Sequence, residues 1–327
     1  MGKRFSVVTL TYAHFNHLKE TVLSVCAQDY DDIEYIICDD GSKNFPEDHI
    51  IKWIEDNKGP NLKQYMVLRH EENVGTVRNI NYAYSHASGD YFINLSCGDV
   101  FFEKCTISKI ADRMKSDKAK MMVTSRLLYK GGFTPLGLVP HYSEREKLRR
   151  MITKEDQYKS HMKNGMYGMA SGCVLCSSRA IMEELGYFDE RYVLLEDGPL
   201  LAKYLKKYPL NYYPEMISIW YEQGGVSTGG IKELSHVLKK DYLLFSQNEG
   251  IRSQKPQTNY EKQTELFLKA RREAKTIRKK ILCYLRYPIP AISFLEYKLG
   301  DRSKRIIDKP VIKRVLAERG QAAVDGC

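Results

Sequence analysis

Short apolar runs alternate with stretches of helical periodicity over the first 130 residues of the chain. The apolar runs predict buried strands. Between them, apolar residues recur three and four positions apart, which predicts amphipathic helices. The predicted strands cover 5–11, 33–38, 65–68, 91–95 and 121–124, and the predicted helices lie at 18–26, 50–54, 74–87 and 106–114.

This alternation of strand and helix predicts an α/β fold, with a mostly parallel sheet, right-handed crossovers and flanking helices. In such sheets ligands bind beyond the carboxyl ends of the strands. The turns after Thr11, Cys38 and Leu95 are therefore the first places to look for chemistry.

The pattern changes after the fifth predicted strand. Residues 130–165 are polar and irregular and predict a mobile loop, with His141 and His161 as surface residues. Order returns with a short helix predicted at Ala180–Leu185 and an amphipathic helix around 200–205.

Beyond residue 227 the chain takes on a helical character, with apolar periodicity over 231–245 and 261–285. We therefore predict two parts. Residues 1–230 form the domain that contains the sheet, and residues 231–327 form a helical, basic C-terminal extension.

Composition supports a folded protein with a large core. The chain has 327 residues, of which 43% are hydrophobic and 28% charged, and this excludes collagen-like, low-complexity and wholly disordered chains. No segment reaches the roughly 18 uncharged apolar residues that span a bilayer. The first strand follows without an apolar leader, so we expect a cytoplasmic protein whose eight cysteines are mostly buried thiols.

The net charge of +10 is concentrated near the C-terminus, where Lys269–Arg314 contains 15 Lys and Arg against 4 Asp and Glu. Within this region a basic run precedes the apolar and aromatic segments 281–285 and 287–295. The combination favours contact with an anionic membrane surface. A solvated or oligomer-forming helical tail is the alternative, and the absence of a nucleic-acid-binding motif disfavours a nucleic-acid partner.

Polar clusters follow three predicted strands where their carboxyl ends meet. They are Thr11-Tyr12, Asp39-Asp40-Gly41-Ser42 and Ser96-Cys97-Gly98-Asp99. A carboxylate that accepts from a nucleobase N–H, an aromatic ring that stacks on the base and a carboxylate for a divalent ion together describe a nucleotide-sugar pocket. Asp-Asp-Gly-Ser by itself is also typical of a solvated turn.

Several segments in order resemble the glycosyltransferases of family 2, over roughly residues 4–228. The segments are 6–12, 18–25, 35–42, 70–75 with Arg78-Asn79, 87–91, 186–190 and Glu196-Asp197. The resemblance implies the GT-A fold, in which a nucleotide-binding sheet is joined to an acceptor-binding half.

The resemblance also implies a donor site. Thr11 and Tyr12 would line the base, Asp39 would accept from a uracil-type N–H, and Arg78 would lie near the base or phosphate. The donor-binding residues implied in this way are Thr11, Tyr12, Asp39, Asp40, Arg78, Ser96 and Gly98.

The family's acidic run after the fourth strand is depleted in this chain. Where the family has Asp-x-Asp-Asp, the sequence reads Ser96-Cys97-Gly98-Asp99 and keeps the last carboxylate alone. Asp99 then becomes the implied metal ligand. A Mg²⁺ or Mn²⁺ ion held mainly by diphosphate oxygens and water remains compatible with one carboxylate.

Asp197 matches the family's catalytic base, with Glu196 in support. The resemblance implies an inverting glycosyltransferase that uses a nucleotide sugar, UDP-linked, and a hydroxyl of a glycan or lipid-linked glycan at the cytosolic face of a membrane. Two alternatives stay open. Glu196 and Asp197 could be the charged first turn of a helix, and the depleted acidic run could mark a catalytically inactive relative that binds a nucleotide sugar or a partner.

Overall fold

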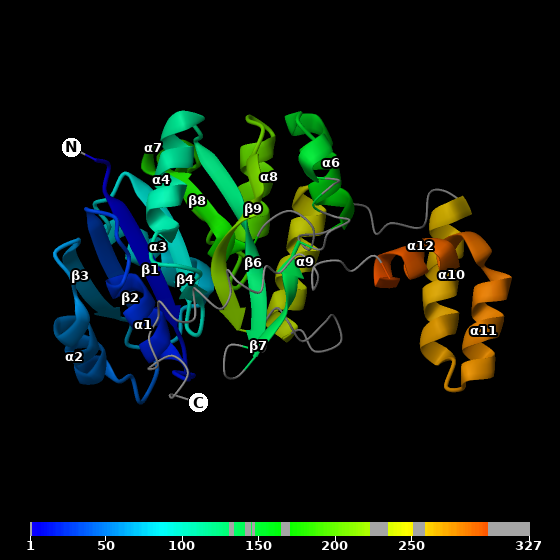
Figure 1. Ribbon diagram of the computed structural model, residues 1–327, viewed down its shortest axis with the longest axis horizontal. Coiled ribbons are helices and arrows are strands. Elements are labelled where there is room, and N and C mark those ends of the chain that lie inside the picture. Colours follow the sequence, from blue (N-terminus) through cyan, green and yellow to red (C-terminus); the bar gives the residue numbers. More distant parts are fainter. Residues whose placement is uncertain are drawn as a thin grey trace.

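The computed structural model describes residues 2–130, 134–140, 145, 148–164, 171–222, 235–250 and 259–299. A nine-stranded sheet runs through the body of the molecule, with helices on its faces (Figure 1). The strand order is β3-β2-β1-β4-β8-β6-β9-β5, and β7 pairs with β6. The strands are β1 (Phe5–Thr11), β2 (Ile33–Asp39), β3 (Leu62–Arg69), β4 (Tyr91–Ser96), β5 (Val100–Phe101), β6 (Met121–Lys130), β7 (Thr134–Val139), β8 (Leu175–Ser178) and β9 (Asn211–Glu222).

The helices that accompany the sheet fall largely where apolar periodicity predicts them. They are α1 (Leu18–Cys26), α2 (Glu47–Asn57), α3 (Thr76–His86), α4 (Thr106–Ser116), α6 (Lys154–Asn164), α7 (Arg179–Leu185), α8 (Asp197–Leu205) and α9 (His236–Asn248). A short 3-10 helix, η2 (Gly172–Val174), precedes β8.

The first four strands form the parallel half of the sheet and confirm the predicted α/β fold. β1 pairs in parallel with β2 and β4, and β2 pairs in parallel with β3. Every residue of β2 is buried, as expected for a strand covered by helices on both faces. The carboxyl ends of β1, β2 and β4 consequently lie at one edge, where the polar turns follow.

The second half of the sheet is mixed, which the sequence pattern did not predict. β8 runs antiparallel to both β4 and β6, whereas β9 runs parallel to β6. Because β8 is antiparallel to β4, its first residues lie where β4 ends. The segment just before β8 is thereby brought to the same edge as the polar turns.

The prediction of a loop over 130–165 was wrong, because β7 and α6 lie inside it. The helix α6 has few apolar residues and is held through buried polar side chains instead. The Gln157 amide donates to the Leu210 carbonyl and accepts from its N–H. His161, predicted at the surface, is fully buried against α8, and His141 lies outside the described residues.

The helix α9 packs on the body of the molecule. Its Leu238 and Phe245 belong to the same core as the sheet strands. The boundary predicted at residue 230 stays a prediction, and residues 223–234 lie outside the described part of the chain. Five of the described cysteines are buried thiols, and Cys97 and Cys105 are partly buried.

Three further helices, later in the C-terminal extension than α9, pack on one another (Figure 1). They are α10 (Asn259–Glu273), α11 (Ile277–Arg286) and α12 (Pro288–Leu299). The helix predicted over 261–285 is thus two helices, and Thr276 caps the second by accepting from the Lys279 N–H. None of the helices in the described ranges has the length and apolar composition needed to cross a bilayer.

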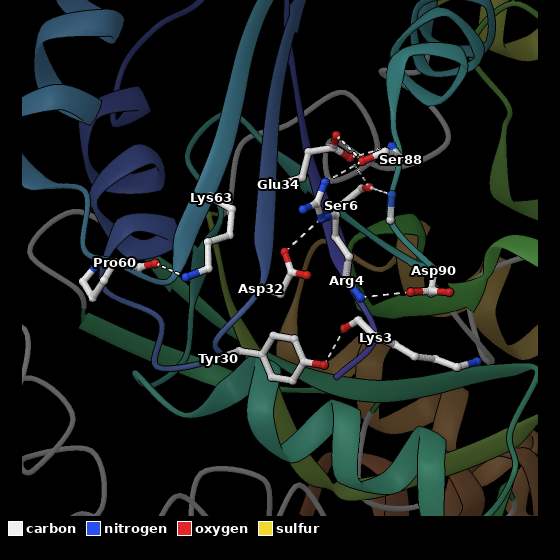
Figure 2. Close-up of polar contacts among 11 residues, drawn as sticks. Lys3, Arg4, Ser6, Tyr30, Asp32, Glu34, Pro60, Lys63, Ser88 and Asp90 are labelled. Atoms are coloured by element: carbon white, nitrogen blue, oxygen red, sulfur yellow. Dashed lines mark hydrogen bonds and ion pairs between the residues drawn. The ribbon is translucent and has the colours of Figure 1, made fainter. Parts of the chain in front are cut away.

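At the amino ends of β1, β2 and β4, a buried carboxylate ties the strands together. Figure 2 shows Glu34 accepting from the Ser6 hydroxyl at 2.5 Å and from the N–H and hydroxyl of Ser88 at 2.7 and 2.8 Å. The Gly89 N–H in turn donates to the Ser6 hydroxyl at 2.9 Å. This network fixes the amino edge, opposite the edge that carries the polar turns.

The close approach at Gly89 predicts that Gly89→Ala destabilises the fold. A Cβ there would lie 2.4 Å from the Ser6 hydroxyl oxygen and 2.6 Å from its backbone nitrogen, so the backbone must move. We expect a loss of about 1–3 kcal/mol in the free energy of unfolding, measured by urea denaturation.

Gly59→Ala is the matched control, because its added Cβ would meet the end of the flexible Asn61 side chain. Equal stability of the two variants would contradict the steric argument for Gly89.

Candidate active site

The turn after β2 is built around a buried aspartate. Asp39 accepts from the Thr11 hydroxyl at 2.9 Å, and from the N–H and hydroxyl of Ser42, each at 2.7 Å. The Ser42 hydroxyl also accepts from the Ala13 N–H at 2.8 Å. These contacts join the ends of β1 and β2 and fix the position of Asp39 at the sheet edge.

Asp40 faces the loop that leads into α3. Its carboxylate accepts from the Val74 and Gly75 N–H groups at 2.7 and 3.0 Å, and from the Asn73 amide at 3.0 Å. Gly41, at a φ of 75°, permits the tight turn, since a Cβ there would lie 2.4 Å from the Glu72 carbonyl carbon. The contacts of Asp40 hold this loop, and a direct contact of Asp40 with a donor stays a prediction.

Two predicted donor residues lie at the surface. Tyr12 follows β1 directly and is 53% exposed, so its ring is free to stack on a ligand. Arg78 projects from α3 and lies 3.7 Å from the Glu190 carboxylate, both side chains being largely exposed. The structure therefore brings Tyr12 next to the Asp39 turn, whereas Arg78 faces the segment that leads towards Glu196.

The turn after β4 buries the remaining carboxylate of the depleted acidic run. Asp99 accepts from the Ser96 N–H at 3.3 Å and from the Glu222 N–H at 3.4 Å. Gly98 has a φ of 93°, and a Cβ there would lie 2.3 Å from a Glu222 carboxylate oxygen. Burial raises the pKa of Asp99 to about 7; the Arg126 guanidinium opposes the shift, and the Glu222 carboxylate adds to it.

Glu196 and Asp197 lie at the beginning of α8, where Asp197 is buried and Glu196 is partly buried. Asp197 accepts from the Gly172 N–H at 3.2 Å and from the Gly198 N–H at 2.8 Å. Burial raises the pKa of Asp197 to about 6, while these N–H groups and the Arg126 guanidinium oppose the shift. Burial and the neighbouring Asp197 charge raise the pKa of Glu196 well above its usual value.

Arg126 on β6 is a site residue that sequence reasoning missed. Its charge lowers the pKa of both Asp99 and Asp197, so it lies within electrostatic range of two carboxyl groups that the sequence separates by almost a hundred residues. Its guanidinium carbon lies 4.3 Å from the centre of the Tyr221 ring, and Nη1 donates to the Cys173 sulfur at 3.6 Å. The buried Nε has no hydrogen-bond partner among the described residues. The sequence feature that could have indicated Arg126 was a single arginine inside an apolar strand.

Glu222, at the end of β9, is the second residue that was missed. Its carboxylate lies 3.3 Å from His17, which is also 3.5 Å from Glu20. Burial raises the pKa of Glu222, and the Glu20 charge adds to the shift while His17 opposes it. Since β9 was not predicted from the sequence, nothing there indicated that Glu222 would adjoin Asp99.

A segment between the two halves of the site is clamped from both sides. On one side, the Val193 carbonyl accepts from the Val77 N–H at 3.0 Å. On the other, one carboxylate oxygen of the buried Asp241 on α9 accepts from three successive N–H groups, at 3.0, 2.6 and 3.1 Å. These belong to Val193, Leu194 and Leu195, directly before Glu196. The clamp positions the carboxyl pair.

The residues present fit a divalent cation that arrives with a diphosphate. Within the described ranges no group of three or more His, Cys, Asp or Glu side chains is arranged to hold a metal by itself. Asp99 and Glu222 nevertheless place two carboxyl groups together, and each has a raised pKa. Mg²⁺ in proteins is commonly held by one or two carboxylates together with phosphate oxygens and water.

Comparison with known proteins identifies the family. The sequence model described as Glycosyl transferase family 2 matches residues 6–181, more than half of the chain. A protein from Rickettsia felis named an uncharacterized glycosyltransferase is 23% identical over 246 residues, which cover 73% of this chain and 38% of that protein. This chain thus spans less than half of that relative's length.

Solved structures confirm the predicted GT-A fold. The mannosyltransferase PcManGT from Pyrobaculum calidifontis, in complex with GDP-Man and Mn²⁺, has a TM-score of 0.51 at 14% identity over 98% of this chain and 81% of that one. S. aureus TarS 1–349, in complex with UDP-GlcNAc, has a TM-score of 0.50 at 15% identity over 99% and 83%.

The clamp predicts that Asp241→Ala destabilises the protein. Three buried N–H groups would lose a charged acceptor, and we expect a loss of about 3 kcal/mol in the free energy of unfolding, measured by urea denaturation. Lys240→Ala, on the exposed side of α9, is the matched control and should change stability by less than about 0.5 kcal/mol. A loss at Asp241 no larger than at Lys240 would show that the clamp contributes nothing.

Proposed function

The chain belongs to glycosyl transferase family 2, and from this premise we propose that it is an inverting hexosyltransferase. It would move a sugar from a UDP-linked donor to a hydroxyl of a glycan or a lipid-linked glycan. The observation that carries the proposal is the grouping of Asp99 and Asp197 around Arg126 at the edge where Thr11, Tyr12 and Asp39 also lie. A cytoplasmic location, peripheral to the membrane that holds a lipid-linked acceptor, is part of the proposal.

The donor half of this site is formed by the turns after β1, β2 and β4. Tyr12 offers an exposed ring for the base, and the Asp39 carboxylate, which accepts three hydrogen bonds from Thr11 and Ser42, retains one of about four acceptor sites for a base N–H. Asp99 would hold a Mg²⁺ or Mn²⁺ ion, which would neutralise charge on the diphosphate leaving group. Arg126 adds a fixed positive charge near the same carboxylate, in a setting where water is largely excluded.

Asp197 is suited to the role of base. An inverting transferase needs a carboxylate that takes the proton from the acceptor hydroxyl as it attacks the anomeric carbon. With a pKa raised to about 6, Asp197 is ionised at neutral pH and yet a stronger base than an exposed aspartate. Burial and the Asp197 charge raise the pKa of the neighbouring Glu196 well above its usual value, which favours a protonated Glu196 beside an ionised Asp197.

The depleted acidic run favours a second candidate, a catalytically inactive relative that binds a nucleotide sugar or a partner enzyme. Asp99 alone remains of the run, and burial gives it a pKa of about 7, so it is only partly ionised at neutral pH without a cation. Binding without turnover would distinguish this candidate from the transferase.

A thermal-shift panel of UDP-, GDP- and dTDP-sugars, with and without Mn²⁺, tests the donor. A ligand that binds only the folded state stabilises it by about 2.7 kcal/mol at a hundred times its Kd. We expect UDP-sugars to raise the melting temperature most, with a larger rise when Mn²⁺ is present. Asp99→Ala should remove the Mn²⁺ dependence, and a panel without any shift would overturn the proposal.

Asp197→Asn tests the base. The variant cannot accept the hydroxyl proton, so we expect turnover to fall by about 10²–10⁴-fold while the thermal shift with donor is retained. In the unsubstituted enzyme, turnover should rise with pH through about 6, because the base must lose its proton to act. Retained turnover in Asp197→Asn would remove Asp197 from this role, and donor binding without turnover in the unsubstituted protein would favour the inactive relative.

A further inference from the structure

The C-terminal helices carry an exposed apolar face. On α11, Ile277, Ile281 and Leu285 are 77%, 53% and 71% exposed. Their spacing of four residues places them one above the other along a single side of the helix. On α12, which packs against α11, Ile289 and Ile292 are exposed as well.

This face is separate from the small core that holds the three helices together. That core is lined by Phe267, Cys283 and Ala291, with the Tyr284 and Phe294 rings packed against it. The Phe267 ring meets the Tyr284 and Phe294 rings edge to face, with centroids 5.5 and 5.7 Å apart. The helix bundle is therefore closed on its inner side, and the outer stripe is not needed for its packing.

Basic side chains border the apolar stripe. At 100° per residue, Arg278 lies at one border of the stripe on α11, just beyond Leu285, and Lys280 lies on the other side, before Ile277; Lys279 lies nearly opposite the stripe, and all three are exposed. Long basic side chains can lay their stems along apolar surface while the charged ends reach outward. The surrounding sequence has 15 Lys and Arg against 4 Asp and Glu between Lys269 and Arg314. The face is thus apolar along its middle, with a basic residue of α11 on each side and further positive charge around it.

We infer that the outer face of α11 and α12 docks on the surface of an anionic lipid bilayer. An apolar stripe flanked by basic residues matches a helix that lies in the interface, with its side chains among the acyl chains and its charges at the headgroups. Each basic residue near such a surface contributes to attraction by negatively charged lipids. This inference assigns a surface of the chain to the peripheral location that is part of the proposed function, and it requires neither donor nor acceptor.

The positive charge and the apolar stripe of this face together favour a bilayer over a second copy of the chain or a nucleic acid. A second copy of the chain docked on this face would bring two clusters of positive charge together, and like charges across an interface repel. A nucleic acid would satisfy the charge but leave the apolar stripe in water. An anionic bilayer satisfies both features.

Co-sedimentation of the full chain with vesicles tests this assignment. We expect binding to phosphatidylcholine vesicles that contain phosphatidylserine, weaker binding at high salt, and little binding to phosphatidylcholine alone. Arg278→Glu/Lys279→Glu/Lys280→Glu should lower the apparent partition coefficient at least about tenfold. Ile281→Ser/Leu285→Ser leaves the net charge unchanged and should also lower the partition coefficient. Because these side chains are exposed, circular dichroism should show that both variants stay folded.

The control variant is Lys115→Glu/Lys118→Glu/Lys159→Glu, which changes the net charge by the same amount at exposed positions on the body. It should bind vesicles as the unsubstituted chain does. If both triple variants lost vesicle binding equally, net charge alone would explain the loss, and the assignment would be overturned. Absence of binding to anionic vesicles would also overturn it. So would a change of oligomeric state in Ile281→Ser/Leu285→Ser, measured by sedimentation velocity, if that variant still bound vesicles. The assay contains no nucleotide sugar, so its failure leaves the proposed transferase activity standing.

Discussion

Buried carboxylates that accept backbone N–H groups hold the loops around this sheet in place. Asp40 holds the loop before α3, Asp241 holds the segment before α8, and Glu34 holds the turn before β4. A hydrogen bond to a charged acceptor contributes about 1.5–3 kcal/mol, more than one between neutral groups. Each of these loops is thereby held by a single side chain from another element.

The same arrangement links the two halves of the candidate site. The nucleotide-side turn after β2 positions the loop at Gly75, and Gly75 lies against Val193, since a Cβ there would meet a Val193 methyl group at 2.5 Å. Val193 begins the clamped segment that leads to Glu196 and Asp197. The proposed donor side and the proposed base are thus connected through the Asp40 carboxylate and the backbone hydrogen bond between Val77 and Val193.

Burial also determines the chemistry of the carboxyl groups that are left to act. Asp99, Glu196 and Asp197 all have raised pKa values because water is excluded, and Arg126 limits the shift at Asp99 and Asp197. Backbone N–H groups and this internal cation thus together favour the ionised forms of the two acids. The C-terminal helices present the opposite electrostatic character, with positive charge displayed around an apolar stripe at the surface.

The sequence by itself determined the parallel half of the fold and the location of the polar turns, because strand and helix periodicity are local properties and parallel strands end at a common edge. The family resemblance, confirmed by the comparisons, also indicated Asp39, Asp99 and Asp197; their individual roles stay predictions. Only the tertiary structure decided the antiparallel insertion of β8, the pairing of β9, and the helix α6. It also decided that Arg126, Glu222 and Asp241 adjoin the site. Their partners lie tens of residues or more away in the chain, so their contacts depend on strand pairing and helix packing that no local pattern encodes.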